Sequence, residues 1–276
     1  MQAVAEIRIA FIGAGNMAAS IIGGLVARGH PPASVSASDP SPDSLARLRE
    51  VAPVATGSDN RAAVEGADVV ILAVKPQVME QVCTDIAPAL AGGDTVALSI
   101  AAGIPVASLE RWLGPGVPVI RCMPNTPALL GAGASGLYAT SAVNETQRAH
   151  AAKILSAVGL VRWVEAEDDL HAVTAVSGSG PAYFFLFMEA MAAEGERLGL
   201  DRETATALTA QTCLGAARMA AESGVELAEL RRRVCSPGGT TERAIESFRG
   251  DGLEATVARA MAACLARSRE MADELG

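Results

Sequence analysis

Two stretches of small residues in the second half of the chain are suited to holding a carboxylate. The first runs from Val176 to Tyr183 and includes Ser177, Gly178, Ser179 and Gly180, and the second runs from Ser236 to Thr241. We expect each to be a backbone-exposing loop that opens a helix. Free N–H groups and the positive end of the helix dipole converge at such a start, so it can bind an anion without a charged side chain.

A separate glycine-rich segment near the N-terminus is suited to binding phosphate. The sequence Gly13-Ala14-Gly15-Asn16-Met17-Ala18 follows an apolar run that ends at Ile12 and precedes a helical pattern. Gly13 would permit a tight turn, Gly15 would let a pyrophosphate approach the backbone, and Ala18 would allow close helix packing. The segment predicts dinucleotide binding, with a purely structural glycine turn as the alternative. Together with the carboxylate loops, it indicates a reductase for a small acid.

An acidic residue follows the second predicted strand. Asp39 lies 21 residues beyond Ala18, where a carboxylate can accept hydrogen bonds from the adenine ribose and repel a 2′-phosphate. This favours NADH over NADPH. The alternative is a turn residue before Pro40, and nearby Arg47 and Arg49 leave tolerance of the phosphate open.

Further loops are expected at the same edge of the sheet. Lys75 lies in the segment Ala73, Val74, Lys75, Pro76, and could line the cofactor cleft or occupy the surface at a helix start. Small residues around Ala101 and Asn125 leave room for a flat nicotinamide ring. Asn60 has two readings that stay open: an N-cap for the next helix, or a hydrogen-bonding group for the adenosine ribose.

The first 160 residues alternate short apolar runs with amphipathic stretches. Continuous apolarity is typical of strands buried on both faces, so the pattern predicts a parallel, doubly wound, Rossmann-type α/β sheet. We expect strands at 7–12, 34–38, 69–74, 95–100 and 117–122, and helices at 17–28, 42–50, after Pro76, and at 105–113.

After Trp163 the strand signal disappears and helical spacing continues to the C-terminus. We therefore expect a dinucleotide-binding domain at 1–163 and a helical substrate-binding and dimerisation domain at 164–276. The helix after Pro181 begins with a run that is apolar on every side and needs cover all round. An obligate oligomer would supply that cover, and the alternative is the central helix of a monomeric bundle.

Composition excludes several classes of function. The 22 basic and 31 acidic residues give a formal charge of −9 with no Lys/Arg-rich block, which argues against nucleic acid as a partner. The apolar runs are too short to span a membrane, and Glu6 and Arg8 interrupt the N-terminal apolar stretch where a signal peptide would need its core. Five cysteines without a Cys-x-x-Cys pair indicate reduced thiols in a cytoplasmic protein and argue against a metal site.

Five motifs, in order over essentially the whole chain, resemble those of pyrroline-5-carboxylate reductases. They are Phe11-Ile12-Gly13-Ala14-Gly15-Asn16-Met17, Ala73-Val74-Lys75-Pro76, Arg121-Cys122-Met123-Pro124-Asn125-Thr126-Pro127, the run from Ala172 to Tyr183, and Ser236-Pro237-Gly238-Gly239-Thr240-Thr241. The resemblance implies reduction of the cyclic imine of 1-pyrroline-5-carboxylate to L-proline with NADH or NADPH, the last step of proline biosynthesis. It also implies homodimers that assemble into larger rings.

The resemblance also implies roles for individual residues. Thr240 and Thr241 would offer backbone N–H groups to the substrate carboxylate, and the Thr241 hydroxyl would lie near the ring nitrogen as the candidate catalytic group together with Ser177. The remaining substrate-binding residues would be Gly178, Ser179, Gly180, Ser236, Gly238 and Gly239. The cofactor-binding residues would be Ile12, Gly13, Ala14, Gly15, Asn16, Met17, Asp39, Asn60, Ala73, Val74, Lys75, Pro76, Ala101, Asn125 and, near the nicotinamide, Glu167.

Two positions depart from the family pattern. Asp39 stands where some relatives carry a small hydroxyl residue, which puts NADPH preference in doubt. Cys235 replaces a hydroxyl residue and is read as a packing thiol, with a redox-sensitive thiol as the alternative.

Two other functions are weighed against this one. A β-hydroxyacid dehydrogenase has a similar domain order but needs a general acid or base for the hydroxyl, typically a lysine in the helical domain, and this chain has no lysine after Lys153. A binding module would take up the cofactor without turnover. The three histidines form no recognisable triad, and His171, just ahead of the first carboxylate loop, is the one that could assist proton delivery.

Overall fold

The computed structural model describes residues 7–276, and contacts divide the chain into two compact units. One unit contains the residues up to Ser179 together with Cys264–Gly276, and the other contains Gly180–Ala263. Glu6, used above against a signal peptide, lies outside the described residues. A domain boundary after residue 163 stays a prediction.

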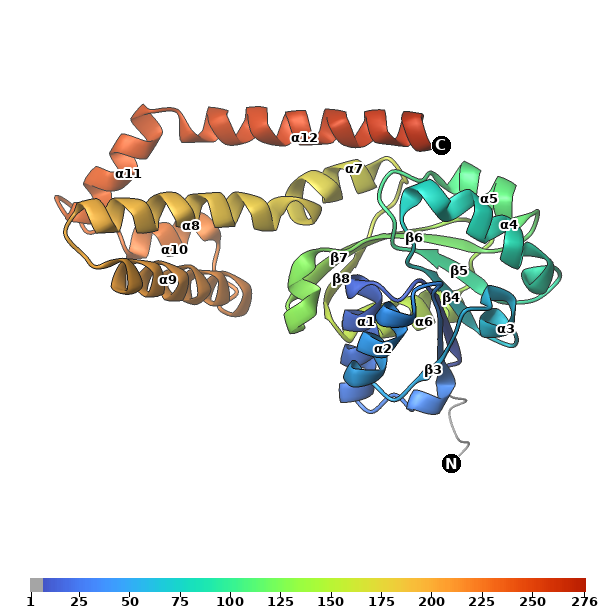
Figure 1. Ribbon diagram of the computed structural model, residues 1–276. Coiled ribbons are helices and arrows are strands. Elements are labelled where there is room, and N and C mark those ends of the chain that lie inside the picture. The colour runs from blue at the N-terminus through green and yellow to red at the C-terminus, as the bar shows by residue number, and fades with distance from the viewer. Residues whose placement is uncertain (1–6) are drawn as a thin grey trace. The chain divides into compact units, whose positions relative to one another are not determined.

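The first unit is built on an eight-stranded sheet (Figure 1). Its strands are β1 (Ile9–Ile12), β2 (Val35–Ser38), β3 (Ala55–Gly57), β4 (Val69–Leu72), β5 (Val96–Ser99), β6 (Val119–Met123), β7 (Gly133–Ala139) and β8 (Gly159–Trp163). The spatial order is β3-β2-β1-β4-β5-β6-β7-β8. From the neighbouring strands β1 and β4, successive strands are added toward both edges of the sheet. This is the doubly wound arrangement that the apolar runs predict.

Helices cover both faces of this sheet (Figure 1). The covering helices are α1 (Asn16–Ala27), α2 (Pro42–Val51), α3 (Asn60–Val64), α4 (Met79–Leu90), α5 (Val106–Leu113) and α6 (Glu145–Ser156). The unit also contains α7 (Asp169–Val173) and the short 3-10 turns η1 (Pro32–Ser34), η2 (Pro76–Val78) and η3 (Thr126–Leu130). Successive residues of a strand point to opposite faces. Phe11 accordingly packs in a core with α1, α2 and α6, while Ile12 packs in a second core with α3, α4 and α5.

The Rossmann-type α/β class is confirmed, but the sheet is mixed. Strand β7 runs antiparallel to β6, with Ile120 opposite Ala139. An entirely parallel sheet is therefore wrong. β7 has the sequence Gly-Ala-Ser-Gly-Leu-Tyr-Ala, whose small residues lack the continuous apolarity that marks the central strands. The short strand β3 gives no apolar signal either, because two of its three residues are exposed at the edge.

The second unit is entirely helical among the residues that the structure describes. It contains α8 (Gly180–Arg197), α9 (Arg202–Glu222), α10 (Leu227–Arg233), α11 (Thr240–Gly250) and the first part of α12 (Leu253–Leu275). Only Gly180, Ala205 and Thr209 of this unit are buried. The absence of strands after residue 164 matches the sequence pattern.

The apolar run at the start of α8 has no cover within its own unit. Phe184 is 67% exposed, Phe185 61% and Leu186 67%. Phe187 contacts Phe248 of α11, with ring centroids 5.9 Å apart. A central helix in a monomeric bundle would be buried, so that alternative is wrong and the exposed face is of the kind that associates with another surface.

None of the helices within residues 7–276 combines the length and apolarity that crossing a membrane requires.

Candidate functional site

The glycine-rich turn after β1 has a shape that only glycine can adopt at its first position. Gly13 has φ +102°, and a Cβ atom there would lie 2.6 Å from the carbonyl oxygen of Ala73. Its N–H donates to the carbonyl of Ser38 at 2.7 Å. The turn is therefore pressed between the ends of β4 and β2, where a side chain has no room.

The start of α1 is open to a ligand. Gly15 is exposed, and a Cβ built on it meets nothing within 4 Å. No side chain caps this helix start, and its first turn carries no acidic residue. The first backbone N–H groups of a helix have no partner within the helix, and they attract anions. The residues present thus fit a dinucleotide diphosphate, with Gly13 forming the turn and Gly15 leaving the approach clear.

Other predicted cofactor residues lie at the same carboxyl edge. Ala73 directly follows β4, and its N–H donates to the carbonyl of Ile12 at 2.8 Å. Lys75 is exposed before Pro76 and the short turn η2. Ala101 follows β5 and is half-buried.

Asn60 does not cap the helix that follows it. Asp59 is the N-cap of α3, and its carboxylate accepts hydrogen bonds from the N–H groups of Arg61 and Ala62. The N-cap reading of Asn60 is therefore wrong. Instead its Oδ1 accepts from the Ser38 hydroxyl at 2.8 Å, which ties α3 to the end of β2. This places the amide beside the edge where a ribose would lie.

Asp39 faces the glycine-rich turn. Its Oδ2 accepts from the N–H of Ala14 at 2.8 Å, and its Oδ1 accepts from the N–H of Ser41 at 2.8 Å. The residue thus fills the turn position before Pro40 and also contacts the turn that would hold the diphosphate. The two readings from the sequence are compatible.

The first carboxylate loop is not a free helix start. A π-helical turn, η4 (Thr174–Gly178), follows α7 directly and is separated from α8 by Ser179 alone. The N–H of Ser179 donates to the carbonyl of Thr174 at 2.8 Å, and the Ser177 hydroxyl donates to the carbonyl of Val173 at 3.0 Å. The expectation of an open loop is therefore wrong for residues 176–178, which are already helical, while a helix does begin at Gly180.

Asn125 links the loop after β6 to that π-helical turn. It is buried, its Nδ2 donates to the carbonyl of Ser177 at 3.0 Å, and its Oδ1 accepts from the N–H of Ala134 at 2.8 Å. Gly178 also fits closely here, since a Cβ atom on it would lie 2.5 Å from Cε of Met123. The edge of the sheet therefore fixes the position of residues 177 and 178.

Glu167 forms a partly buried junction with Arg121, an arginine that sequence reasoning missed. Its Oε1 accepts from Nη1 of Arg121 at 2.5 Å and from the N–H of Val106, at the start of α5, at 2.7 Å. The Arg121 side chain is 8% exposed and that of Glu167 30%. A lone charge inside the otherwise apolar strand β6 was the available signal, because a buried charge needs a partner.

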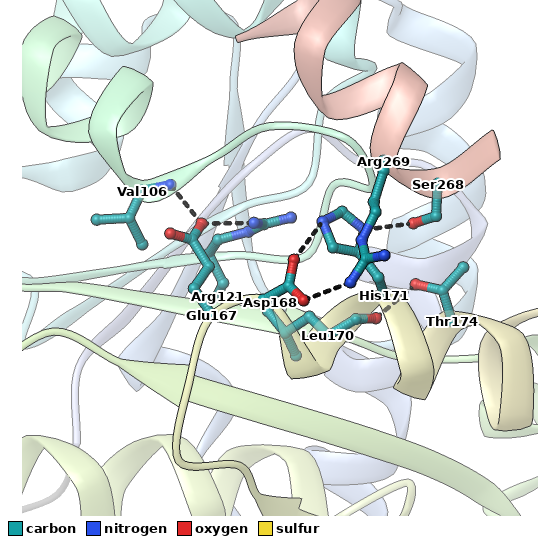
Figure 2. A network of polar contacts seen from close by, with 9 residues as sticks. All are labelled: Val106, Arg121, Glu167, Asp168, Leu170, His171, Thr174, Ser268 and Arg269. Atoms are coloured by element: carbon teal, nitrogen blue, oxygen red, sulfur yellow. Dashed lines mark hydrogen bonds and ion pairs between the residues drawn. The ribbon is translucent and has the colours of Figure 1, made fainter. Parts of the chain in front are cut away.

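A second branch of the same network fastens the end of α12 (Figure 2). Figure 2 shows Glu167 extending toward Arg121 and Val106, while its neighbour Asp168 extends toward His171 and Arg269. Asp168 contacts Arg269 at 2.6 Å, and Nδ1 of His171 lies 2.8 Å from the Ser268 hydroxyl. The arginine beside Asp168 lowers the pKa of that carboxyl, and burial lowers the pKa of His171.

The second carboxylate loop, which belongs to the helical unit, does open a helix. Gly239 is the N-cap of α11 and has no side-chain cap, and Gly238 has φ +70°. Gly238 donates its N–H to Glu242 at 2.7 Å, and Gly239 donates to the carbonyl of Ser236 at 2.9 Å. Thr240 and Thr241 occupy the first turn, where N–H groups lack partners within the helix. Cys235, just before this loop, is half-buried.

The fold and the open start of α1 define a Rossmann-class, dinucleotide-binding oxidoreductase with a helical second half. A family model for pyrroline-5-carboxylate reductase dimerisation matches residues 167–271, and one for NADP oxidoreductase, coenzyme F420-dependent, matches residues 8–103. The chain is 58% identical over 269 residues to the pyrroline-5-carboxylate reductase of Pseudomonas aeruginosa, covering 98% of each chain. It is 38% identical to that of Escherichia coli K12, covering 96% of this chain and 98% of the relative.

Solved structures of pyrroline-5-carboxylate reductases superpose on this chain over nearly its whole length. A pyrroline-5-carboxylate reductase from Coxiella burnetii superposes with a TM-score of 0.94 at 44% identity, covering 96% of this chain and 98% of that one. The Plasmodium falciparum enzyme, solved with NADP bound, gives 0.83 at 28% identity and the same coverage. The chain belongs to the pyrroline-5-carboxylate reductase family. The likeness to a Mycobacterium tuberculosis 3-hydroxyisobutyrate dehydrogenase, with 20% identity and a TM-score of 0.52, is one of fold alone.

The two glycines of the turn provide a matched pair of substitutions. Gly15→Ala adds a methyl group where the protein has open space, so we expect unchanged thermal stability but dinucleotide affinity at least about tenfold weaker, ~1.4 kcal/mol. Gly13→Ala forces a side chain to φ +102° and against Ala73, so it should lower the melting temperature. Calorimetric titration and thermal unfolding measure the two effects, and unchanged affinity in Gly15→Ala would rule out diphosphate at this helix start.

Because the His171 side chain is partly buried, the free energy of unfolding should differ between pH 7 and pH 5. Its pKa is lowered in the folded protein, so below about 6.5 the unfolded chain binds a proton that the folded chain resists. Stability is therefore expected to fall as the pH drops below about 6.5. His171→Asn keeps a polar contact for Ser268 but does not titrate, so its unfolding free energy should change less over this range. Equal pH slopes for the two proteins in urea denaturation would contradict this.

Proposed function

We propose that this protein reduces 1-pyrroline-5-carboxylate to L-proline with NADH or NADPH, the last step of proline biosynthesis. The observation that carries the proposal is the match to this family over 98% of the chain at 58% identity. An uncapped α1 start behind Gly13 and Gly15 supports it independently, since that is where a dinucleotide diphosphate would bind. The comparisons favour this function over a β-hydroxyacid dehydrogenase.

The reaction makes modest demands on the protein. When bound, the reduced nicotinamide supplies a hydride to the imine carbon, while the ring nitrogen carries one added proton. A protonated imine is already electrophilic, so the residues must chiefly hold the reactants in near-attack geometry and exclude water. Such positioning can contribute ~7 to 11 kcal/mol. A chain without a histidine triad or a lysine in its helical half is compatible with this chemistry.

The cofactor would lie along the carboxyl edge of the sheet. Its diphosphate would meet the segment from Ile12 to Met17, and its adenosine would lie near Asp39 and Asn60. The loops at Ala73–Pro76 and Ala101 would border it, and the nicotinamide end would lie toward Asn125 and Glu167. The link from Asn125 to Ser177 and the junction of Glu167 with Arg121 support a positioning role for both side chains.

The substrate carboxylate would bind at the start of α11. Thr240 and Thr241 would donate their N–H groups, and the bend formed by Ser236, Gly238 and Gly239 would shape the pocket. The Thr241 hydroxyl would position a proton at the ring nitrogen, with water as the source. Ser177, Gly178, Ser179 and Gly180 are also proposed as substrate-binding residues, through their backbone, because the Ser177 hydroxyl is bonded to the carbonyl of Val173.

The Thr241 hydroxyl can be tested directly. Thr241→Ala should lower kcat/KM for pyrroline-5-carboxylate by about ten- to a hundredfold, because one hydrogen bond at the reacting nitrogen is lost. Ser247→Ala, at an exposed position of the same helix, should behave like the unaltered protein. The assay follows the decrease in NAD(P)H absorbance, with a panel of β-hydroxyacids and NAD(P)+ as comparison. Full turnover by Thr241→Ala would remove the hydroxyl from the proposed role.

The helical half is a dimerisation domain, and we also propose that homodimers assemble into larger rings in the cytoplasm. The exposed apolar face of α8 supports association, since Phe184, Phe185 and Leu186 lack cover in their own unit. Phe185→Asp would bury a charge in that interface, at a cost that association cannot offset. We expect it to shift sedimentation toward monomer. Val51→Asp, on an exposed apolar residue of the nucleotide-binding unit, should leave the assembly unchanged.

A further inference from the structure

The end of β2 lies beside the glycine-rich turn. Strands β1 and β2 are in parallel register, with Ile12 opposite Ser38, so Gly13 and Asp39 leave the sheet side by side. The Gly13 N–H bonded to the Ser38 carbonyl holds the two strand ends together. Asp39 therefore lies next to the turn proposed to hold the diphosphate.

The Asp39 carboxylate is fixed in this place. One oxygen accepts from the N–H of Ala14 and the other from the N–H of Ser41, each at 2.8 Å. The main-chain N–H of Asp39 also donates to the carbonyl of Gly57 in β3 at 3.1 Å. A carboxylate has about four acceptor sites on its two oxygens, so two backbone donors leave further sites for the hydroxyls of a ribose.

The two arginines nearest to Asp39 in the sequence after it each donate to a hydroxyl group. Arg49 donates to the Thr56 hydroxyl at 2.8 Å, and Arg47 donates to the Ser44 hydroxyl at 3.3 Å. Both extend from α2, whose own start is capped by the Ser41 hydroxyl and carries Asp43 in its first turn. A 2′-phosphate here would meet the Asp39 carboxylate and a helix start that is already capped.

We propose that Asp39 makes this protein selective for NADH, by accepting hydrogen bonds from the adenine ribose hydroxyls and repelling a 2′-phosphate. The proposal rests on the proposed function for the reaction, and it narrows the cofactor to one of the two. Selection follows from a repulsive element as much as from an attractive one, which is how specificity between similar ligands is commonly achieved.

Binding measurements test this without turnover. NADH and NADPH are each titrated calorimetrically into the purified, full-length oligomer. We expect NADH to bind at least about tenfold more tightly than NADPH at low ionic strength, with the ratio shrinking in high salt as the repulsion is screened. Equal affinities, or tighter binding of NADPH, would overturn the proposal.

Variants assign the selectivity to the residue. Asp39→Ser removes the carboxylate, and Asp39→Asn removes its charge at nearly constant size, so both should weaken NADH binding and strengthen NADPH binding. Asp43→Asn removes a neighbouring charge that does not contact the turn and should change the ratio by less than about twofold. If Asp39→Ser unfolds, Asp39→Asn and the unaltered protein still decide the question. An unchanged ratio in Asp39→Asn would show that another group selects the cofactor.

The two proposals fail in different ways. Preferential binding of NADPH together with reduction of pyrroline-5-carboxylate would overturn only the role of Asp39. Tight NADH binding without turnover of pyrroline-5-carboxylate would overturn the proposed reaction and leave the selectivity intact.

Discussion

The close approach of Gly13 to the backbone of Ala73 is the constraint on which the nucleotide-binding edge depends. It is possible because residue 13 has no Cβ atom and adopts a positive φ. The approach brings the ends of β1, β2 and β4 together, and with them the start of α1, Asp39 and the segment before Pro76. A methyl group at residue 13 would push the Ala73 backbone away from the turn. The close-packed cores on both faces of the sheet leave little room for that shift.

Polar side chains also hold the later segments of this unit against the sheet. Asn125 holds the π-helical turn to the sheet, and Glu167 joins Arg121 to the start of α5. Removing Glu167 would leave the Arg121 charge, whose side chain is 8% exposed, without compensation. These contacts give residues 177–179 a fixed place before any ligand binds, which limits the ordering that binding must achieve.

The helical unit has a small core of its own. Three of its residues are buried, while the phenylalanines at the start of α8 are largely exposed. A domain of this size normally buries a far larger share of its apolar surface. Dimerisation and folding of this half are therefore expected to be linked, so that its stability depends on protein concentration.

The sequence by itself determined the glycine-rich turn, the central strands and the helical second half, because each rests on a local pattern that burial on both faces or helical spacing imposes. Only the tertiary structure decided the direction of β7, whose pairing with β6 joins distant residues, and the partnership of Arg121 with Glu167, 46 positions apart. It also decided that residues 176–178 belong to a π-helical turn ahead of α8 instead of an open loop, since small residues permit either conformation. The hydrogen bond from Asn125 and the packing against Met123 hold the π-helical turn, and neither can be read from the segment itself.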